Sequence, residues 1–197
     1  MFRLLLATHN AHKTREFAQI LGPDCEVSDL SSKPDVPKVE ENGRTFEENA
    51  IAKAVAVSRA VTGLVVADDS GLEVPALGGA PGVYSARYAG AEAKDHENVA
   101  KLLSELAVNK LEGASRRARF YCALALACQG ELIAVLHGDV TGVIAERPRG
   151  DQGFGYDPVF VPAGFDQTFA EMGEEVKNQI SHRAQALRGL QQWFARK

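Results

Sequence analysis

The stretch LVVADDSG, Leu64–Gly71, places two adjacent carboxylates directly after a run of apolar residues. Short unbroken runs rich in Val and Leu are typical of strands that are buried on both faces of a sheet. We therefore predict a strand that ends at Asp68, Asp69 and Ser70, and ligands bind at this edge of open α/β sheets. Mg2+ fits two neighbouring carboxylates, because it takes oxygen ligands from one or two of them and keeps waters for a phosphate. The alternative is a strand that ends in a polar turn, where Asp, Ser and Gly are common.

Charge and composition limit the class of protein. Of the 197 residues, 45% are hydrophobic and 24% are charged, which is ordinary for a globular protein with its own core. The net charge of -4 argues against a protein that coats nucleic acid, and a polyanionic substrate would need a local basic cluster or a metal. The first residues lack a signal-peptide pattern, and no apolar run approaches the roughly 20 residues of a membrane span. We expect a cytoplasmic protein without membrane or nucleic-acid partners, in which Cys25, Cys122 and Cys128 are reduced thiols.

A second candidate site follows the first predicted strand, Phe2–Ala7. The polar loop that begins at Thr8 leads into a helix, and the unpaired amides of a helix N-terminus favour an anion. Lys13 falls in the first turn, where the helix dipole disfavours a cation. A phosphate held between Lys13 and the loop amides would remove this conflict. The alternative is an ordinary turn in which Thr8 or Asn10 caps the helix.

Residues 26–44 are predicted to be a connection, because two prolines exclude helix there. Glu40 and Glu41 lie before an Asn-Gly pair, so they either form a solvated turn or bring a second carboxylate to a metal. The next helix is predicted over residues 45–62. Lys53 lies beside its apolar stripe, where the side chain either extends to solvent or directs its cation toward the sheet edge.

The second half of the chain does not alternate regularly between strands and helices. Residues 120–128 and 132–136 flank Gly130 and predict a hairpin of long strands, which residues 140–145 can extend. We infer an α/β fold with two lobes, one of them richer in strands, and an active-site cleft between them.

Phe154 is bracketed by Gly153 and Gly155, so the backbone bends sharply and presents the ring. An aromatic ring on a turn is a stacking platform for a base. The alternative is a core aromatic beside a tight turn.

The last segment, residues 174–197, is predicted to be helical and carries Lys177 and Arg183. In one continuous helix these residues would lie about 240° apart around the axis. They can face one ligand only if the helix breaks near Ser181, which could cap a new helix. The alternative is a solvated basic face.

Six short motifs run in order across nearly the whole chain: Thr8-x-Asn10-x-x-Lys13-x-x-Glu16, Phe46-x-x-Asn49-x-x-x-Lys53, Asp68-Asp69-Ser70-Gly71, Gly78-Gly79-x-Pro81-Gly82, Phe154-Gly155-Tyr156-Asp157-Pro158 and Ser181-His182-Arg183. Together they resemble the motifs of the inosine triphosphate pyrophosphatase family, the dITP/XTP pyrophosphatases. The chain departs from the pattern at His9, where many members have Gly. The resemblance implies an elongated α/β fold with a central mixed sheet flanked by helices, and a homodimer. It also implies Mg2+-dependent hydrolysis of ITP, dITP and XTP to the nucleoside monophosphate and pyrophosphate, which cleanses the nucleotide pool.

The resemblance further implies roles for individual residues. Asp69 would bind Mg2+ and accept a proton from the attacking water. Glu40 is the preferred second metal ligand, and Asp68 and Glu41 are alternatives. Phe154 would stack on the purine. The residues expected to bind substrate are Thr8, His9, Asn10, Ala11, His12, Lys13, Lys53, Ser70, Phe154, Gly155, Tyr156, Asp157, Lys177, His182 and Arg183.

Two other functions stay open at this stage. The chain could be a pyrophosphatase of broader range that acts on other damaged nucleotides. It could also be a nucleotide sensor that binds without hydrolysis, although a sensor has no use for a proton acceptor such as Asp69.

Overall fold

The computed structural model describes residues 2–196 and contains one mixed sheet of six strands. The strand order is β2-β1-β3-β4-β5-β6. The strands are β1 (Phe2–Leu6), β2 (Cys25–Asp29), β3 (Leu64–Glu73), β4 (Arg117–Cys128), β5 (Glu131–Ile144) and β6 (Phe160–Pro162). β1 pairs in parallel with β2 and β3, whereas β5 and β6 are antiparallel. The predicted mixed α/β sheet is confirmed.

The helices are α1 (Ala11–Leu21), α2 (Phe46–Ala60), α3 (Asp95–Val108), α4 (Phe169–Met172), α5 (Glu174–Ile180) and α6 (His182–Ala195), together with the short 3-10 helices η1 (Leu30–Ser32), η2 (Pro75–Leu77), η3 (Gly82–Arg87) and η4 (Gly113–Arg116). Within residues 2–196, none of these helices combines the length and the apolar character needed to cross a membrane.

The chain divides into two compact units. Unit 1 contains the residues up to Asp69, Cys122–Gly138 and the residues from Arg183 on. Unit 2 contains Ser70–Tyr121 and Asp139–His182.

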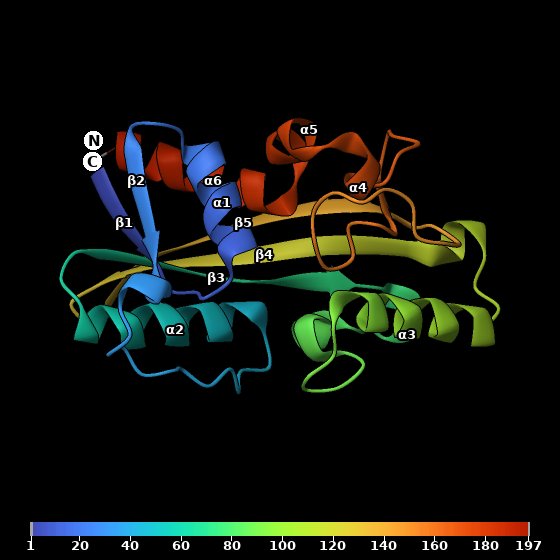
Figure 1. Cartoon of the computed structure of the whole chain (residues 1–197), viewed down its shortest axis with the longest axis horizontal. Helices are drawn as coiled ribbons and strands as arrows, with labels where there is room; N and C mark the ends of the chain where they lie inside the picture. Colours follow the sequence, from blue (N-terminus) through green and yellow to red (C-terminus); the bar gives the residue numbers. More distant parts are fainter. Residues whose placement is uncertain (1, 197) are drawn as a thin grey trace. The chain divides into compact units, whose positions relative to one another are not determined.

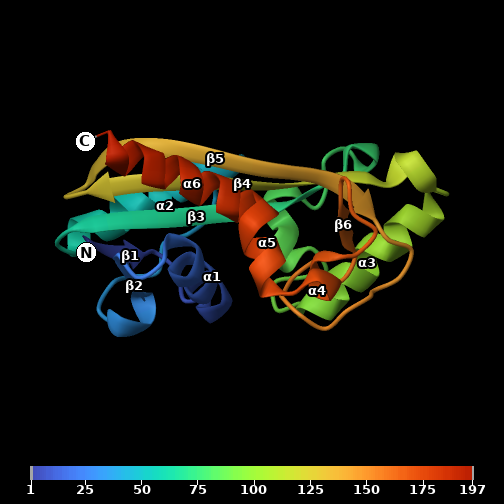
Figure 2. The ribbon, with the colours of Figure 1, turned by 90° about the horizontal axis from the view of Figure 1, so that it is seen from above.

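Unit 1 has one apolar core that joins strands and helices. Leu4 of β1 and Val66 of β3 pack with Phe17 of α1 and with Leu187 and Leu190 of α6. The three-residue spacing of the two leucines places them on one face of the helix. α1 and α6 lie on one side of β3 and α2 lies on the other (Figure 1). Seen from above, α6 runs along the unit 1 part of β4 and β5 (Figure 2). β3 is therefore covered on both faces in unit 1, as its apolar sequence predicts.

Unit 2 has a separate apolar core. Leu102 and Leu106 of α3 pack with Leu72 of β3, and three phenylalanine rings belong to the same core. The Phe120 and Phe160 rings lie 4.7 Å apart in an edge-on arrangement, and Phe169 lies 5.3 Å from Phe160.

One strand differs from its predicted extent. β3 does not end at the paired carboxylates but continues to Glu73, so Asp68 and Asp69 lie within the strand. The ladder between β1 and β3 stops earlier, at the pair Leu6 and Val66. β1 therefore does not pair with the two carboxylates, although both are buried, and the sequence of β3 alone cannot reveal this.

The connection predicted over residues 26–44 is also wrong in part, because β2 occupies its beginning. Only one residue of β2, Cys25, is buried. A strand with so little buried surface has a weak sequence pattern, and its pairing with β1 determines it.

The predicted hairpin is confirmed, and β5 is longer than expected. Gln129 and Gly130 both have positive φ, 52° and 85°, which is the backbone that a two-residue turn between strands requires.

Candidate active site

The Asp68 carboxylate lies in the middle of a buried ion-pair cluster in unit 1. Lys13 Nζ donates to Asp68 Oδ1, and Arg183 Nε donates to Oδ2 at 3.1 Å. The thiol of Cys122 lies 3.2 Å from the same Oδ2, and Arg183 also donates to Glu16. Burial opposes ionisation of Asp68, but Arg183 and Lys13 outweigh it, so its pKa is well below the ordinary value. Asp68 is therefore ionised at neutral pH and holds two cations in place.

The unfavourable position of Lys13 at the start of α1 is compensated, because its ammonium is paired with the Asp68 carboxylate. Asn10 caps α1: its side-chain oxygen accepts from the amides of His12 at 2.9 Å and of Lys13 at 3.2 Å. Thr8 Oγ1 accepts in turn from the Asn10 amide. The capped turn is thus confirmed, and phosphate binding by this loop stays a prediction. His9, Asn10, Ala11 and His12 are exposed, so the loop is accessible to a ligand.

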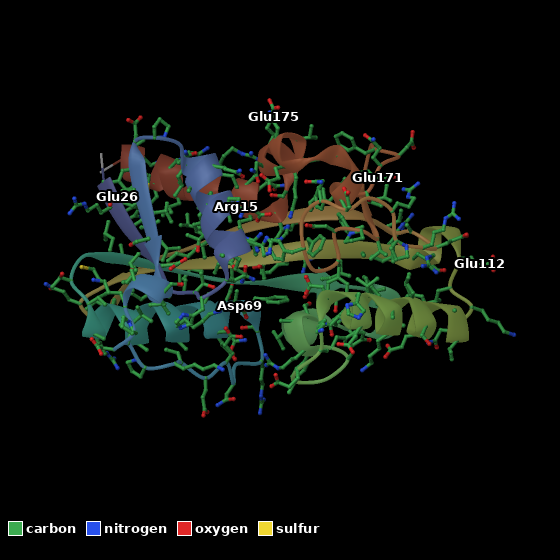
Figure 3. All side chains as sticks on the ribbon, viewed as in Figure 1. Arg15, Glu26, Asp69, Glu112, Glu171 and Glu175 are labelled. Carbon is green, nitrogen blue, oxygen red and sulfur yellow. The ribbon has the colours of Figure 1, made fainter. Side chains whose placement is uncertain are left out.

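Asp69 points to a second set of partners in unit 1, next to the N-terminal end of α2 (Figure 3). Asn49 Nδ2 donates to Asp69 Oδ2 at 3.0 Å, and Lys53 Nζ lies 3.6 Å from Oδ1. Burial raises the pKa of Asp69 above its ordinary value, although Lys53 and Lys13 oppose the shift. A buried carboxyl with a raised pKa is a stronger base than a solvated one.

Lys53 is not a solvent-directed lysine. Its ammonium donates to Glu41 Oε1 at 2.6 Å and to the Asp68 backbone oxygen at 2.9 Å. Burial lowers the pKa of Lys53, but Asp69 and Glu41 reverse the effect and raise it. Lys53 therefore stays charged and joins the two acidic side chains.

The donor set around Asp69 fits Mg2+, which is commonly held by one or two carboxylates with waters and phosphate oxygens. Within residues 2–196 no group of three or more His, Cys, Asp or Glu side chains forms a ready metal cage. Glu41 is engaged with Lys53, whereas Glu40 is exposed and accepts a hydrogen bond from Asn42 Nδ2 at 2.8 Å. Because few carboxylates lie near Asp69, a metal bound there would take its other ligands from water and the substrate phosphates.

The turn that carries Phe154 lies in unit 2 and is fixed by Asp157. Asp157 Oδ2 accepts from the Phe154 amide at 2.8 Å and from Lys177 Nζ at 2.6 Å. The ammonium of Lys177 also lies 4.8 Å from the centre of the Phe154 ring. Gly153 has a φ of 78°, and a Cβ there would come within 2.1 Å of Asp157 Oδ2, so only glycine fits. The half-buried Phe154 ring thus stands on a tight turn beside a cation.

Two other predicted base-binding residues are buried in unit 2. Tyr156 donates its hydroxyl to the Ser85 backbone oxygen at 2.9 Å. His182 stacks on Phe120 with ring centres 4.7 Å apart and an angle of 7° between the planes. Ser70 continues β3 and is partly exposed.

The predicted break in the C-terminal helical segment is confirmed. α5 ends at Ile180 and α6 begins at His182, with Ser181 in an extended conformation between them. Lys177 belongs to unit 2 and Arg183 to unit 1.

The sequence analysis assigns no role to three residues that contact Arg183, Asp68 or Asp69 in unit 1: Glu16, Asn49 and Cys122. The first two lie in the motifs described above. Glu16 follows Lys13 by one helical turn, and Asn49 precedes Lys53 by one turn. This spacing places each on the same helix face as its lysine and is a usable signal. Cys122 has no such signal, because its contact with Asp68 depends on how the strands are arranged.

Comparisons with known proteins cover nearly the whole chain. A dITP/XTP pyrophosphatase of Bacillus subtilis (strain 168) is 51% identical over 191 residues, covering 96% of each chain. A dITP/XTP pyrophosphatase of Geobacillus kaustophilus (strain HTA426) is 53% identical over 195 residues, 98% of this chain and 95% of that one.

Among solved structures, the Staphylococcus aureus Ham1 protein is 42% identical with a TM-score of 0.85 and covers 98% of both chains. A HAM1 protein from Coxiella burnetii is 38% identical with a TM-score of 0.88 over the full length of both. The Ham1 family model matches residues 4–193. The chain therefore belongs to the Ham1 family.

Proposed function

We propose that the protein hydrolyses the deaminated purine nucleoside triphosphates dITP, ITP and XTP to the nucleoside monophosphate and pyrophosphate. The relatives named dITP/XTP pyrophosphatases share about half of their residues with this chain over almost its full length. The observation that carries the proposal is Asp69, a buried carboxyl with a raised pKa that Asn49 and Lys53 hold in place.

We assign Mg2+ as the cofactor, with Asp69 and Glu40 as the side chains that would hold it. Bound there, the metal would supply positive charge to the phosphate oxygens and would lower the pKa of a bound water. Glu40 is preferred over Glu41 because the Glu41 carboxylate is already engaged with Lys53, while Glu40 is exposed.

The side chains of unit 1 supply the remaining chemistry at the phosphates. Asp69 accepts a proton from the attacking water, and its burial makes it a better base. Lys13 and Lys53 are the cations assigned to the phosphates, and the metal would offset the carboxylates with which they are paired. The loop from Thr8 to His12 offers further polar groups to the phosphates. Ser70 is also assigned to substrate binding, and Lys177 is assigned to the phosphates as a further cation.

The side chains of unit 2 are proposed to bind the base. Phe154 offers a ring face for stacking, and Tyr156, Asp157 and His182 are assigned to the edge of the purine, while Gly155 belongs to the same turn. We also assign Arg183 to the oxygen at position 6, because a guanidinium has donors only. Adenine presents an amino group at that position and would leave a donor unmatched, at about 1–3 kcal/mol for a buried group.

We further propose that the protein acts in the cytoplasm as a homodimer. Its three cysteines, Cys25, Cys122 and Cys128, are free thiols, which suits a reducing compartment.

The decisive experiment measures pyrophosphate release from ITP, XTP, dITP, ATP and GTP, with and without Mg2+. We expect the first three to be preferred and the metal to be required. Asp69→Asn should lower kcat by about 100-fold or more while the protein stays folded, because positioned proton transfer contributes about that much. Tight binding of ITP without pyrophosphate release would support a sensor instead, and equal rates with all five substrates would refute the base preference.

A further inference from the structure

The turn that carries Phe154 is held by two carboxylates that accept from two successive amides. The Phe154 amide donates to Asp157 Oδ2 at 2.8 Å, and the Gly155 amide donates to Asp95 Oδ2 at 2.6 Å. Asp157 belongs to the turn itself. Asp95 lies 60 residues earlier than Gly155, at the start of α3, and thus fixes the turn from outside.

α3 is a rigid support for this contact. Its residues Leu102 and Leu106 are fully buried in the core of unit 2. The Asp95 carboxylate lies in the first turn, where the helix dipole favours a negative charge. A charged acceptor also makes a stronger hydrogen bond to an amide than a neutral one.

The turn needs such support because its two glycines leave its backbone conformationally free without it. Gly155 adopts a φ of 61°, and Gly153 a φ of 78°. Glycine has many accessible conformations, so a turn with two of them loses much conformational entropy when it is fixed. Asp95 and Asp157 together fix the amides on either side of the Phe154 ring.

We propose that Asp95 is a positioning residue for the base: it holds the turn so that the Phe154 ring is in place before the nucleotide binds. This role rests on the proposed stacking of the purine on Phe154. A turn that is ordered in advance removes an entropic cost from binding. Its loss weakens the binding of the ground state and of the transition state equally, which raises KM and leaves kcat unchanged.

The alternative is that Asp95 only stabilises the N-terminus of α3, and the same helix turn offers a matched control for this effect. Glu97 also lies in the first turn and accepts from the Lys94 amide at 2.6 Å, which closes the N-terminal cap of α3. Glu97→Ala therefore weakens the helix start without removing the acceptor of the Gly155 amide. Asp95→Asn keeps a side-chain acceptor of the same length without its charge, so it should restore part of the function that Asp95→Ala loses.

The test measures kcat and KM for ITP in the wild-type protein and in Asp95→Ala, Asp95→Asn and Glu97→Ala. We expect KM to rise about tenfold in Asp95→Ala, with kcat within about twofold, since tenfold corresponds to about 1.4 kcal/mol, near the value of one charged hydrogen bond. Glu97→Ala should stay within about twofold of the wild-type KM, and the KM of Asp95→Asn should lie between those of the wild-type protein and Asp95→Ala. Product inhibition gives a second readout: inhibition by IMP should weaken in Asp95→Ala as KM rises, and inhibition by pyrophosphate should not.

Three results would overturn the role of Asp95: an unchanged KM in Asp95→Ala, an equal rise in Glu97→Ala, or an equal loss of pyrophosphate inhibition. Asp95→Ser suits a helix start but is too short to reach the Gly155 amide, so it replaces the alanine variant if that protein does not fold. Wild-type protein that releases no pyrophosphate from ITP would refute the proposed function, and this role with it. Wild-type turnover with an unchanged KM in Asp95→Ala would refute this role alone.

Discussion

Arg183 and Asp68 form a buried ion pair, with Arg183 Nε 3.1 Å from Asp68 Oδ2 and both side chains almost fully enclosed. The guanidinium also donates to Glu16, so one cation lies between two carboxylates. Buried charges of this kind are costly unless each is paired. The pairing explains how Asp68 stays ionised beside Asp69, whose pKa is shifted in the opposite direction.

Asp68→Asn should destabilise the protein by about 3–5 kcal/mol at neutral pH, because it leaves the buried cations without their shared carboxylate. The folded-state pKa of Asp68 is well below the unfolded value of about 3.9, so its stabilising effect is present above that value and is lost as the pH falls through the folded-state pKa. Denaturant unfolding from pH 3 to 8 should show a difference from wild type that is largest at neutral pH and shrinks below about pH 4. Asp35→Asn, at an exposed position, is the control and should show little difference at any pH. A loss for Asp68→Asn that does not change with pH would contradict this account.

Arg183→Gln should reduce the preference for ITP over ATP, measured as the ratio of their kcat/KM values, by about tenfold. A glutamine amide offers an acceptor as well as donors, so it can match the amino group of adenine. Tenfold corresponds to about 1.4 kcal/mol, within the cost of one unmatched buried donor. Arg188→Gln changes an exposed arginine of the same helix and should leave the ratio unaltered. An unchanged ratio in a folded Arg183→Gln protein would assign Arg183 to the Asp68 cluster alone.

The sequence predicts well the parts of the site that depend on local pattern. The buried run of β3, the Thr45 cap of α2, the break at Ser181 and the turn around Phe154 each follow from neighbouring residues. Lys53 and Lys13 are also identified, but their partners are not. Lys13 and Asp68 are 55 positions apart, and Arg183 and Asp68 are 115 apart, so only the folded chain brings them together.

The wrong end predicted for β3 and the missed role of Asp95 also depend on contacts between distant segments of the chain. β3 continues past the paired carboxylates, and its pairing with β1 stops before them because β1 ends at Leu6. The sequence gives no signal that Asp95 contacts the Phe154 turn, because the helix dipole alone accounts for an acidic residue at a helix start. Its contact with Gly155 becomes visible only in the fold.

Glu40→Gln should raise the Mg2+ concentration for half-maximal activity by about tenfold or more, because the metal loses one of its few carboxylate ligands. Glu41→Gln should leave this concentration nearly unchanged, since Glu41 serves Lys53, and should instead raise KM by loosening that lysine. The two variants are matched in chemistry and adjacent in the chain. The measurement is a Mg2+ titration of pyrophosphate release at saturating ITP. The reverse result, a Mg2+ effect in Glu41→Gln alone, would make Glu41 the second metal ligand.

Phe154→Leu should raise KM for ITP between about fivefold and 150-fold, because stacking of a base on an aromatic ring contributes about 1–3 kcal/mol. Leucine keeps the turn apolar and leaves the backbone contacts of Asp157 and Asp95 intact, so the change tests the ring itself. The same substitution also removes the ring face that Lys177 covers at 4.8 Å. Phe165→Leu is the matched control, since Phe165 is 43% exposed and has no proposed role. Equal KM values for Phe154→Leu and the control would show that the ring is not the stacking surface, and a fall in kcat at constant KM would place Phe154 in the chemical step rather than in binding.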